Sequence, residues 1–338
     1  AWTPFWPRFK QMVTTVLSHR TIKRRAQAAG ITHAWIFYGF AALFAGTSII
    51  TLDHDILKPL IGWEFWYGSF YLVFSVIMDV AGVGLIAGLL YMMYRRKWLK
   101  LPRLDYTRPD RSPGDPDFDR SGYRREDWAF LWTLILIGIT GFLLEASRLV
   151  WLQDRPVVWD YRWFSPVGAV IAYLMKAVGI GAEGAANFRL GLWWFHGLLA
   201  LTFIALIPFT KVKHIFTAMG SLMARDPEAK RRLPMADVEG EKIGFANLTD
   251  FSDKYLLNVD ACTKCGRCHE ACPANASGFP LSPRDLVLTL RELANDTLSH
   301  ASMPEGPIVV TGDGVNMIRP ETLWSCRTCS ACVEICPV

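Results

Sequence analysis

Four long apolar runs dominate the first 210 positions of the chain. The first, residues 33–52, contains no Lys, Arg, Asp or Glu. Because an α-helix rises about 1.5 Å per residue, this run would extend about 30 Å, the thickness of the hydrocarbon layer of a bilayer. Similar runs occupy about residues 65–94, which contain a single acid at Asp79, 128–150 and 190–210. Soluble core helices rarely stay this apolar for so long, so these runs predict an all-α membrane helix bundle of four spans.

Lys and Arg concentrate in three of the segments that flank or connect these runs. Segments 1–32, 95–127 and 211–232 hold 6, 10 and 6 of them, whereas 53–64 and 151–189 hold 1 and 4. Cytoplasmic loops are enriched in Lys and Arg. The chain is therefore expected to be a multi-pass protein of the cell (inner) membrane. Its four spans place all three basic segments on the cytoplasmic side.

Two smaller features of the apolar half have their own interpretations. The apolar stretch at about 166–180 is too short to cross the membrane and is expected to form a helix on the outer surface. Gly82, Gly84 and Gly88 superficially resemble a dinucleotide-binding fingerprint, but no strand precedes them. We expect Gly84 and Gly88 to permit close packing between helices instead.

The composition supports a membrane environment and excludes other classes. The 338 residues are 51% hydrophobic, 13% aromatic and only 20% charged, with a net charge of +5. This balance is not that of a disordered chain. The basic residues flank the apolar runs rather than lining one face. We therefore expect the lipid bilayer as a partner and do not expect a nucleic acid.

Four of the seven histidines lie at span ends. His33 and His54 bracket the first span, and His196 and His214 bracket the fourth, at five helical turns from each other. Because these two spans run in opposite directions, His33 is expected at the depth of His214, and His54 at the depth of His196. Two such layers of imidazoles would hold one or two haem b groups. His54 is the weakest of the four candidates, because it stands beyond the end of the span between Asp53 and Asp55, where a plain loop histidine is the alternative. The alternative for all four is that they are interfacial histidines that cap helices or meet headgroups.

The remaining histidines are expected on the surface, whereas two acids within the spans are candidates for function. Three histidines lie outside the spans and are expected on the surface: His19, His269 and His300. Asp79 lies within the second span, and Glu145 lies in the third with Arg148 one turn away as a possible ion-pair partner. Charged groups are costly in a bilayer, so Asp79 and Glu145 are candidates for relaying protons to a quinone. Structural pairing between helices is the alternative for both.

All eight cysteines lie in the last 77 residues, in two copies of the motif C-x2-C-x2-C-x3-C-P. In such a motif three thiolates hold one 4Fe-4S cluster and the fourth reaches the other. Disulfides are disfavoured in a reducing compartment, and zinc sites prefer paired spacings. The first cluster is therefore assigned to Cys262, Cys265, Cys268 and Cys336, and the second to Cys326, Cys329, Cys332 and Cys272.

The motifs also define the domain organisation. Ser282-Pro283-Arg284-Asp285 is a typical helix start, with Ser as the cap and an acid in the first turn. An α-helical two-cluster ferredoxin domain is therefore expected at 251–338. A basic segment at 1–32, a transmembrane cytochrome b domain at 33–215 and a linker at 216–250 precede it.

These features together resemble a known fusion. The spans with histidines resemble the nitrate reductase gamma-subunit cytochrome b, and the doubled cysteine motif resembles the ferredoxin part of the heterodisulfide reductase D polypeptide. That order, with the run ITGFLLEASR at 139–148, is similar to membrane-bound Fe-S oxidoreductases of the electron-transfer-flavoprotein:(mena)quinone type over nearly the whole chain. The resemblance implies haem b on His33, His214 and His196, with His54 as the uncertain fourth ligand. Such relatives usually have an earlier span and later CCG domains, so the sequence is expected to be incomplete at both ends.

The resemblance implies a quinone-linked oxidoreductase of a respiratory chain. Electrons would pass from a cytoplasmic donor, reduced electron-transfer flavoprotein, through two 4Fe-4S clusters and haem b to membrane quinone as the substrate. One alternative is an electron-transfer component of a quinol-oxidising complex linked to heterodisulfide or sulfite reductase. Another is a non-catalytic Fe-S/haem conduit in a larger assembly.

Overall fold

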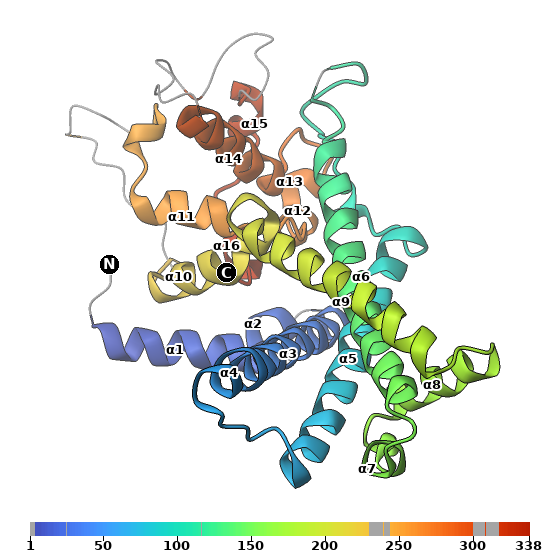
Figure 1. Cartoon of the computed structure of the whole chain (residues 1–338). Coiled ribbons are helices and arrows are strands. Elements are labelled where there is room, and N and C mark those ends of the chain that lie inside the picture. The colour runs from blue at the N-terminus through green and yellow to red at the C-terminus, as the bar shows by residue number, and fades with distance from the viewer. Residues whose placement is uncertain are drawn as a thin grey trace. The chain divides into compact units, whose positions relative to one another are not determined.

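A computed structural model describes the fold of most of the chain, and its regular elements are helices (Figure 1). The described residues are 4–24, 26–115, 117–229, 239, 244–299, 308 and 318–338. Among them, β-structure is limited to isolated bridges, one of which joins Thr107 and Asp119. The chain divides into two compact units, here called the membrane unit (28–95 and 127–206) and the cysteine unit (1–27, 96–126 and 207–338). The all-α fold class is confirmed.

Four long helices supply the spans that the apolar runs predict. They are α3 (Gln27–Ile50), α5 (Gly68–Lys97), α6 (Ser121–Trp151) and α9 (Ala182–Ala205). After α3 the chain continues without a break through the π-helix η1 (Thr51–Leu57) and α4 (Lys58–Ile61), so that the first candidate span has 35 residues. All four are long and apolar enough to cross a membrane, which confirms the four predicted spans.

The ends of these helices differ from the ends of the apolar runs. α6 begins at Ser121 rather than near 128, and α9 covers 182–205 rather than 190–210. Helical hydrogen bonding does not require apolar side chains, so a helix extends into polar sequence until the backbone is interrupted. After α9 the interruption is a 3-10 turn, Ile207–Phe209, which contains Pro208.

The short apolar stretch forms α8 (Pro166–Ala177), whose 12 residues are too few to span a bilayer, as expected. It follows α7 (Pro156–Asp160) and a 3-10 turn, Arg162–Phe164. Its buried face belongs to a core formed with α6 and α9, which contains Ala146, Leu149, Val150, Ala169, Ala172, Met175 and Ala185. α8 is thereby fixed to two of the spans.

The glycines of α5 show where helices approach closely. A Cβ on Gly88 would lie 2.7 Å from Ile36 Cγ1 of α3, so the expected close packing is present there. A Cβ on Gly84 would meet nothing within 4 Å, so the same expectation is wrong for Gly84. Ala81 and Leu85 of α5 contact Gly39 of α3, and Gly88 follows Leu85 at helical spacing. Ala81, Leu85 and Gly88 thus mark the α3-facing side of α5, whereas Gly84, which helical spacing alone would place near the same side, has open space beside it.

The cysteine unit is built from shorter helices (Figure 1). They are α1 (Phe5–Ser18), α2 (Arg20–Lys23), α10 (His214–Met223), α11 (Asp253–Ala261), α12 (Arg267–Glu270), α13 (Pro273–Ala276), α14 (Pro283–Ser299), α15 (Pro320–Trp324) and α16 (Ala331–Ile335). α10 packs against both α1 and α11, and α12 packs against α14 and α16. α14 begins where the sequence predicts, and the hydroxyl of Ser282 accepts a hydrogen bond from the Asp285 N–H at 3.2 Å.

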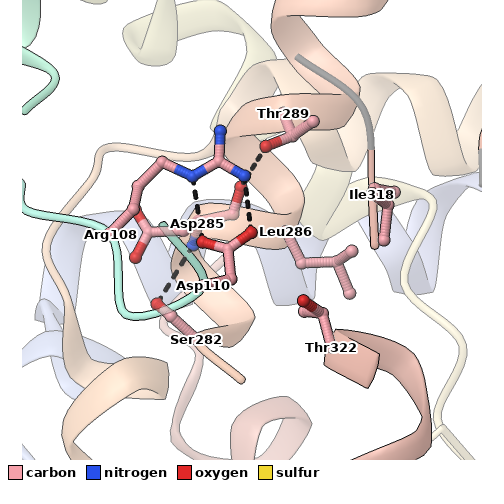
Figure 2. A pocket seen from close by; sticks show the side chains of 8 residues that line it. All are labelled: Arg108, Asp110, Ser282, Asp285, Leu286, Thr289, Ile318 and Thr322. Carbon is pink, nitrogen blue, oxygen red and sulfur yellow. Dashed lines mark hydrogen bonds and ion pairs between the residues drawn. The ribbon is translucent and has the colours of Figure 1, made fainter. Parts of the chain in front are cut away.

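The connection between the second and third spans belongs to the cysteine unit, which no pattern in the sequence indicated. The buried guanidinium of Arg284 donates to the carbonyl oxygens of Arg103 at 3.0 Å and Asp105 at 2.5 Å. Arg120 donates to Thr289 Oγ1 at 2.6 Å. Figure 2 shows Arg108 from the same connection paired with Asp110 in a small cavity beside the first turns of α14. The connection is thereby fastened to the helix between the two cysteine motifs.

Candidate electron-transfer site

The two cysteine motifs fold into loops of the same backbone conformation. In the first, Lys264 and Gly266 have φ values of 59° and 71°, and α12 follows. In the second, Thr328 and Ser330 occupy the corresponding positions with φ values of 50° and 58°, and α16 follows. The left-handed conformation is uncommon for residues other than glycine, so its repetition at matching positions indicates a shared structural requirement. It turns each loop between successive cysteines.

The pKa values of the thiols show which cysteines lie near one another. Burial raises the pKa of Cys336 to about 11, and the thiolates of Cys265 and Cys262 contribute to the shift. Burial likewise raises the pKa of Cys268, with contributions from the thiolates of Cys262, Cys265, Cys336 and Cys332. Burial and the thiolates of Cys326 and Cys272 raise the pKa of Cys332. Cys336 of the second motif therefore lies near Cys262, Cys265 and Cys268 of the first, and Cys272 of the first motif lies near Cys332 of the second, which also acts on Cys268. Cys329 is exposed.

This chemistry fits iron–sulfur clusters. All eight cysteines are free, and several buried thiolates cannot stay ionised close together unless a cation compensates them. In the described part of the chain, no group of three or more His, Cys, Asp or Glu is arranged to hold a single metal ion. A cluster distributes its ligands over several irons and does not require such a group. Ligation of two clusters by these cysteines stays a prediction.

His214 and His196 are each oriented by a hydrogen bond at Nδ1. Nδ1 of His214 lies 2.7 Å from the carbonyl oxygen of Lys211, which can only accept, so this nitrogen carries the proton. Burial lowers the pKa of His214, which favours the neutral imidazole. Nδ1 of His196 lies 2.8 Å from Thr140 Oγ1, whose own proton is donated to Leu136. Both imidazoles therefore present an unprotonated Nε2, the form that binds haem iron.

The other two predicted haem ligands have different surroundings. His33 is half-buried within α3. His54 lies within the π-helix η1, where it is exposed, so the alternative of a plain loop histidine is wrong and its ligation of haem stays a prediction. The preceding Asp53 is buried, and its carboxylate accepts the Phe65 N–H at 2.7 Å. His33 belongs to the membrane unit and His214 to the cysteine unit, so their pairing stays a prediction.

The acids within the spans both make structural contacts. Asp79 is buried, and its Oδ2 accepts the N–H of Val167 at the start of α8. Glu145 forms the expected ion pair with Arg148, by two hydrogen bonds of 2.9 and 2.7 Å, and Arg148 also donates to the Tyr71 hydroxyl. The structural alternative is therefore present for both acids. Their role toward a quinone stays a prediction.

The expectation of surface positions fails for two histidines. His19 is buried at 3% exposure, at the end of α1, where its backbone is left-handed with φ 52°. His269 is half-buried on α12, with its Nδ1 2.8 Å from Ser282 Oγ. Both lie in the cysteine unit, whose packing encloses them. His300 lies outside the described residues.

Comparison with known proteins gives the class of the cysteine-containing segment and identifies relatives of the chain. Residues 261–338 match the family of 4Fe-4S dicluster domains. The chain is 29% identical to the EtfAB:quinone oxidoreductase of Syntrophomonas wolfei over 93% of this chain and 44% of that protein. It is 25% identical to the probable iron-sulfur-binding oxidoreductase FadF of Bacillus subtilis over 92% of this chain and 45% of the relative.

A third relative is similar to the cysteine-containing part alone. It is the D polypeptide of the dihydromethanophenazine:CoB--CoM heterodisulfide reductase of Methanosarcina barkeri, 32% identical over 24% of this chain and 20% of that protein. No solved structure matches. The chain thus spans less than half the length of the first two relatives. The resemblance to membrane-bound Fe-S oxidoreductases is confirmed.

Proposed function

We propose that this chain carries electrons between a cytoplasmic redox protein and a membrane quinone. The observation that carries the proposal is the crosswise grouping of thiols from both cysteine motifs in the unit that also contains His214. Similarity to a protein named EtfAB:quinone oxidoreductase over 93% of the chain supports a quinone-linked activity and suggests electron-transfer flavoprotein as the donor. The chain is then part of a quinone-linked oxidoreductase.

The residues divide into roles along one route. The two thiol groups hold 4Fe-4S clusters, and Nε2 of His214 and of His196 serves as a haem b ligand, with His33 and His54 as their proposed partners. When bound, these groups supply one-electron carriers. Quinone takes up two electrons and two protons to become quinol, and Asp79 and Glu145 are the proposed proton-carrying acids. The three basic segments face the cytoplasm at the inner membrane.

The direction of transfer follows from the number of haem groups. With two, electrons would cross from the cytoplasmic to the outer side of the bilayer. An inside-negative membrane potential favours this movement by about 2.3 kcal/mol per charge per 100 mV. With a single haem, held by His33 and His214, no haem would lie between His54 and His196. Quinone would then react on the inner side.

The test is a redox titration of the purified protein in detergent, followed by visible absorption and electron paramagnetic resonance. Reduced electron-transfer flavoprotein should reduce both clusters, then haem b, then an added quinone analogue. Iron–sulfur signals without any haem Soret band would overturn the route through the histidines. One haem per chain would remove the outer pair.

A second candidate function is supported by the similarity to the heterodisulfide reductase D polypeptide. In that case electrons would run from quinol through the same carriers to a cytoplasmic disulfide. Reduction of the clusters by a quinol analogue, with no reduction by flavoprotein, would favour it. A conduit without a quinone site predicts that neither quinone nor quinol reacts with the purified protein.

A further inference from the structure

A buried lysine lies inside the first cysteine loop. The Lys264 side chain has 0% exposure, one residue before Cys265. A buried ammonium is costly unless it is paired. Its Nζ forms an ion pair with Glu126 near the start of α6, and lies 4.4 Å from the centre of the Tyr123 ring. The second loop has Thr328 at the corresponding position, so this feature is specific to the first motif.

Glu126 uses its two carboxylate oxygens to join two different segments. Oε2 accepts from Lys264 Nζ, and Oε1 accepts the backbone N–H of Lys211 at 2.6 Å. The carbonyl oxygen of Lys211 in turn lies 2.7 Å from Nδ1 of His214. All these residues belong to the cysteine unit. A connection of hydrogen bonds, joined through the covalent backbone of Lys211, therefore runs from the first cysteine loop to the imidazole of His214.

Packing of helices brings the same two segments together independently. α10 begins at His214 and packs against α11, whose last residue, Ala261, immediately precedes Cys262. Lys213 also forms an ion pair with Asp260 of α11. Glu126 completes this arrangement on the side of the loop that contains Lys264.

We propose that Glu126 is a positioning residue for electron transfer between the first cysteine loop and His214. It fixes the loop against the Lys211–His214 turn, holds the imidazole in register through that turn, and completes a hydrogen-bonded path between them. One electron would leave the cluster of the first motif and arrive at the iron bound by Nε2 of His214. This inference rests on the proposed function, because both end points are predicted ligands.

Three variants separate position from charge. Glu126→Asp keeps the charge but is one methylene too short to reach both partners. Glu126→Gln removes a negative charge and is expected to raise the reduction potential of the first cluster, whereas Lys264→Met removes a positive charge and is expected to lower it. The control is Asp253→Asn, which removes an exposed acid at the start of α11, nine residues before Cys262.

The measurement is the rate at which the haem band appears after rapid mixing with dithionite, together with cluster potentials from resonance-monitored titration. Glu126→Asp, Glu126→Gln and Lys264→Met should each slow haem reduction about tenfold or more, because transfer depends on position. The potentials should move in opposite directions for the last two and stay unchanged for Glu126→Asp. Asp253→Asn should retain the wild-type rate. Iron and haem contents confirm that each variant is assembled.

The outcomes distinguish the two levels of the argument. A wild-type protein without haem, or with no transfer to it, overturns the proposed function itself. Wild-type transfer with an unchanged rate in Glu126→Asp overturns the positioning role alone. The positioning role is also overturned if transfer is faster in Lys264→Met and slower in Glu126→Gln. The shifts in the reduction potential of the first cluster would then explain both rates. If Lys264→Met fails to assemble, the comparison of Glu126→Asp with Asp253→Asn decides.

Discussion

A hydroxyl group on α6 determines which nitrogen of His196 is open to a ligand. Thr140 Oγ1 donates its proton to the Leu136 carbonyl at 2.7 Å and so accepts from His196 Nδ1 at 2.8 Å. Hydrogen bonds of this kind fix the ring orientation of metal-binding histidines, and their loss costs about 10-fold or more in affinity. The buried Thr140 is thus part of the proposed haem site although it touches no iron.

Thr140→Val should therefore lower the haem content of the purified protein, because the isosteric side chain cannot accept from Nδ1. We expect an affinity loss of about 10-fold, and a loss of about 1 kcal/mol of stability. The haem-to-protein ratio from the pyridine haemochrome assay measures it. Thr133→Val on the same helix is the control, since the exposed Thr133 hydroxyl bonds only locally, to Ala129 at 2.8 Å. Equal haem loss in both variants would contradict the role of Thr140.

Glu145→Gln tests the structural role of the acid in the third span. The amide has a single oxygen and cannot accept both hydrogen bonds from Arg148, so we expect a loss of about 1–3 kcal/mol in unfolding free energy. Glu64→Gln is the matched control, because its exposed pair with Lys58 should be worth under about 1 kcal/mol. Thermal unfolding in detergent compares them. Equal effects would show that the Glu145 pair is no more important than a surface pair.

Helix packing within the membrane unit depends on the face of α5 that contacts α3. Substitutions of Gly88 and Gly84 test this contact as a pair. Gly88→Ala places a methyl group 2.7 Å from Ile36 Cγ1 and 3.2 Å from the Thr32 carbonyl oxygen, and should cost about 1–3 kcal/mol. Gly84→Ala meets nothing and should be neutral or stabilising by up to about 1 kcal/mol, because alanine favours helix. Thermal unfolding in detergent measures both. The reverse order would disprove the described α3–α5 contact.

The junction of α1 and α2 should respond to mild acid through His19. Burial lowers the pKa of His19, so the folded state favours the neutral ring and the unfolded chain binds the proton more readily. Its contribution to stability is present above the unfolded pKa of about 6.5 and is lost as the pH falls below it. Amide exchange in α1 should accelerate as the pH falls from about 7.5 to about 5.5, after correction for intrinsic exchange. His19→Asn, which also tolerates a left-handed backbone, should reduce this dependence.

The apolar runs predicted the existence of the spanning helices but not their continuation through polar sequence. Residues 51–57 contain Asp53, His54 and Asp55, which in isolation indicate a loop. The helix continues there because the Asp53 carboxylate is buried and accepts the Phe65 N–H. That partner lies 12 residues away, beyond what periodicity reports.

The candidate site divides in the same way. Ligand spacing is local, so the cysteine motifs were recognisable from the sequence. The Lys264–Glu126 pair joins residues 138 positions apart, and neither residue is unusual in its own segment. A long-range pair of this kind becomes visible only after the chain has folded.

At the scale of the whole molecule, the cysteine unit contains the three segments that are rich in Lys and Arg. It comprises 1–27, 96–126 and 207–338, which precede the first span, join the second to the third, and follow the fourth. Segments that pack together in one unit must lie on the same side of a membrane. An even number of spans must therefore separate them, which the four helices satisfy. The charge distribution and the packing thus support one topology independently.

This topology predicts opposite accessibility for two engineered cysteines. Ser112→Cys lies in the connection that packs with the cysteine unit, and Asp154→Cys lies in the connection between the third and fourth spans; both positions are exposed. In intact cells a membrane-impermeant maleimide should label Asp154→Cys above the wild-type background and should label Ser112→Cys only after the membrane is opened. Both cysteines on one side would contradict the four-span arrangement. The two reversed would retain the spans and place the cysteine unit, with its proposed clusters, outside the cytoplasm, where a flavoprotein donor could not reach it.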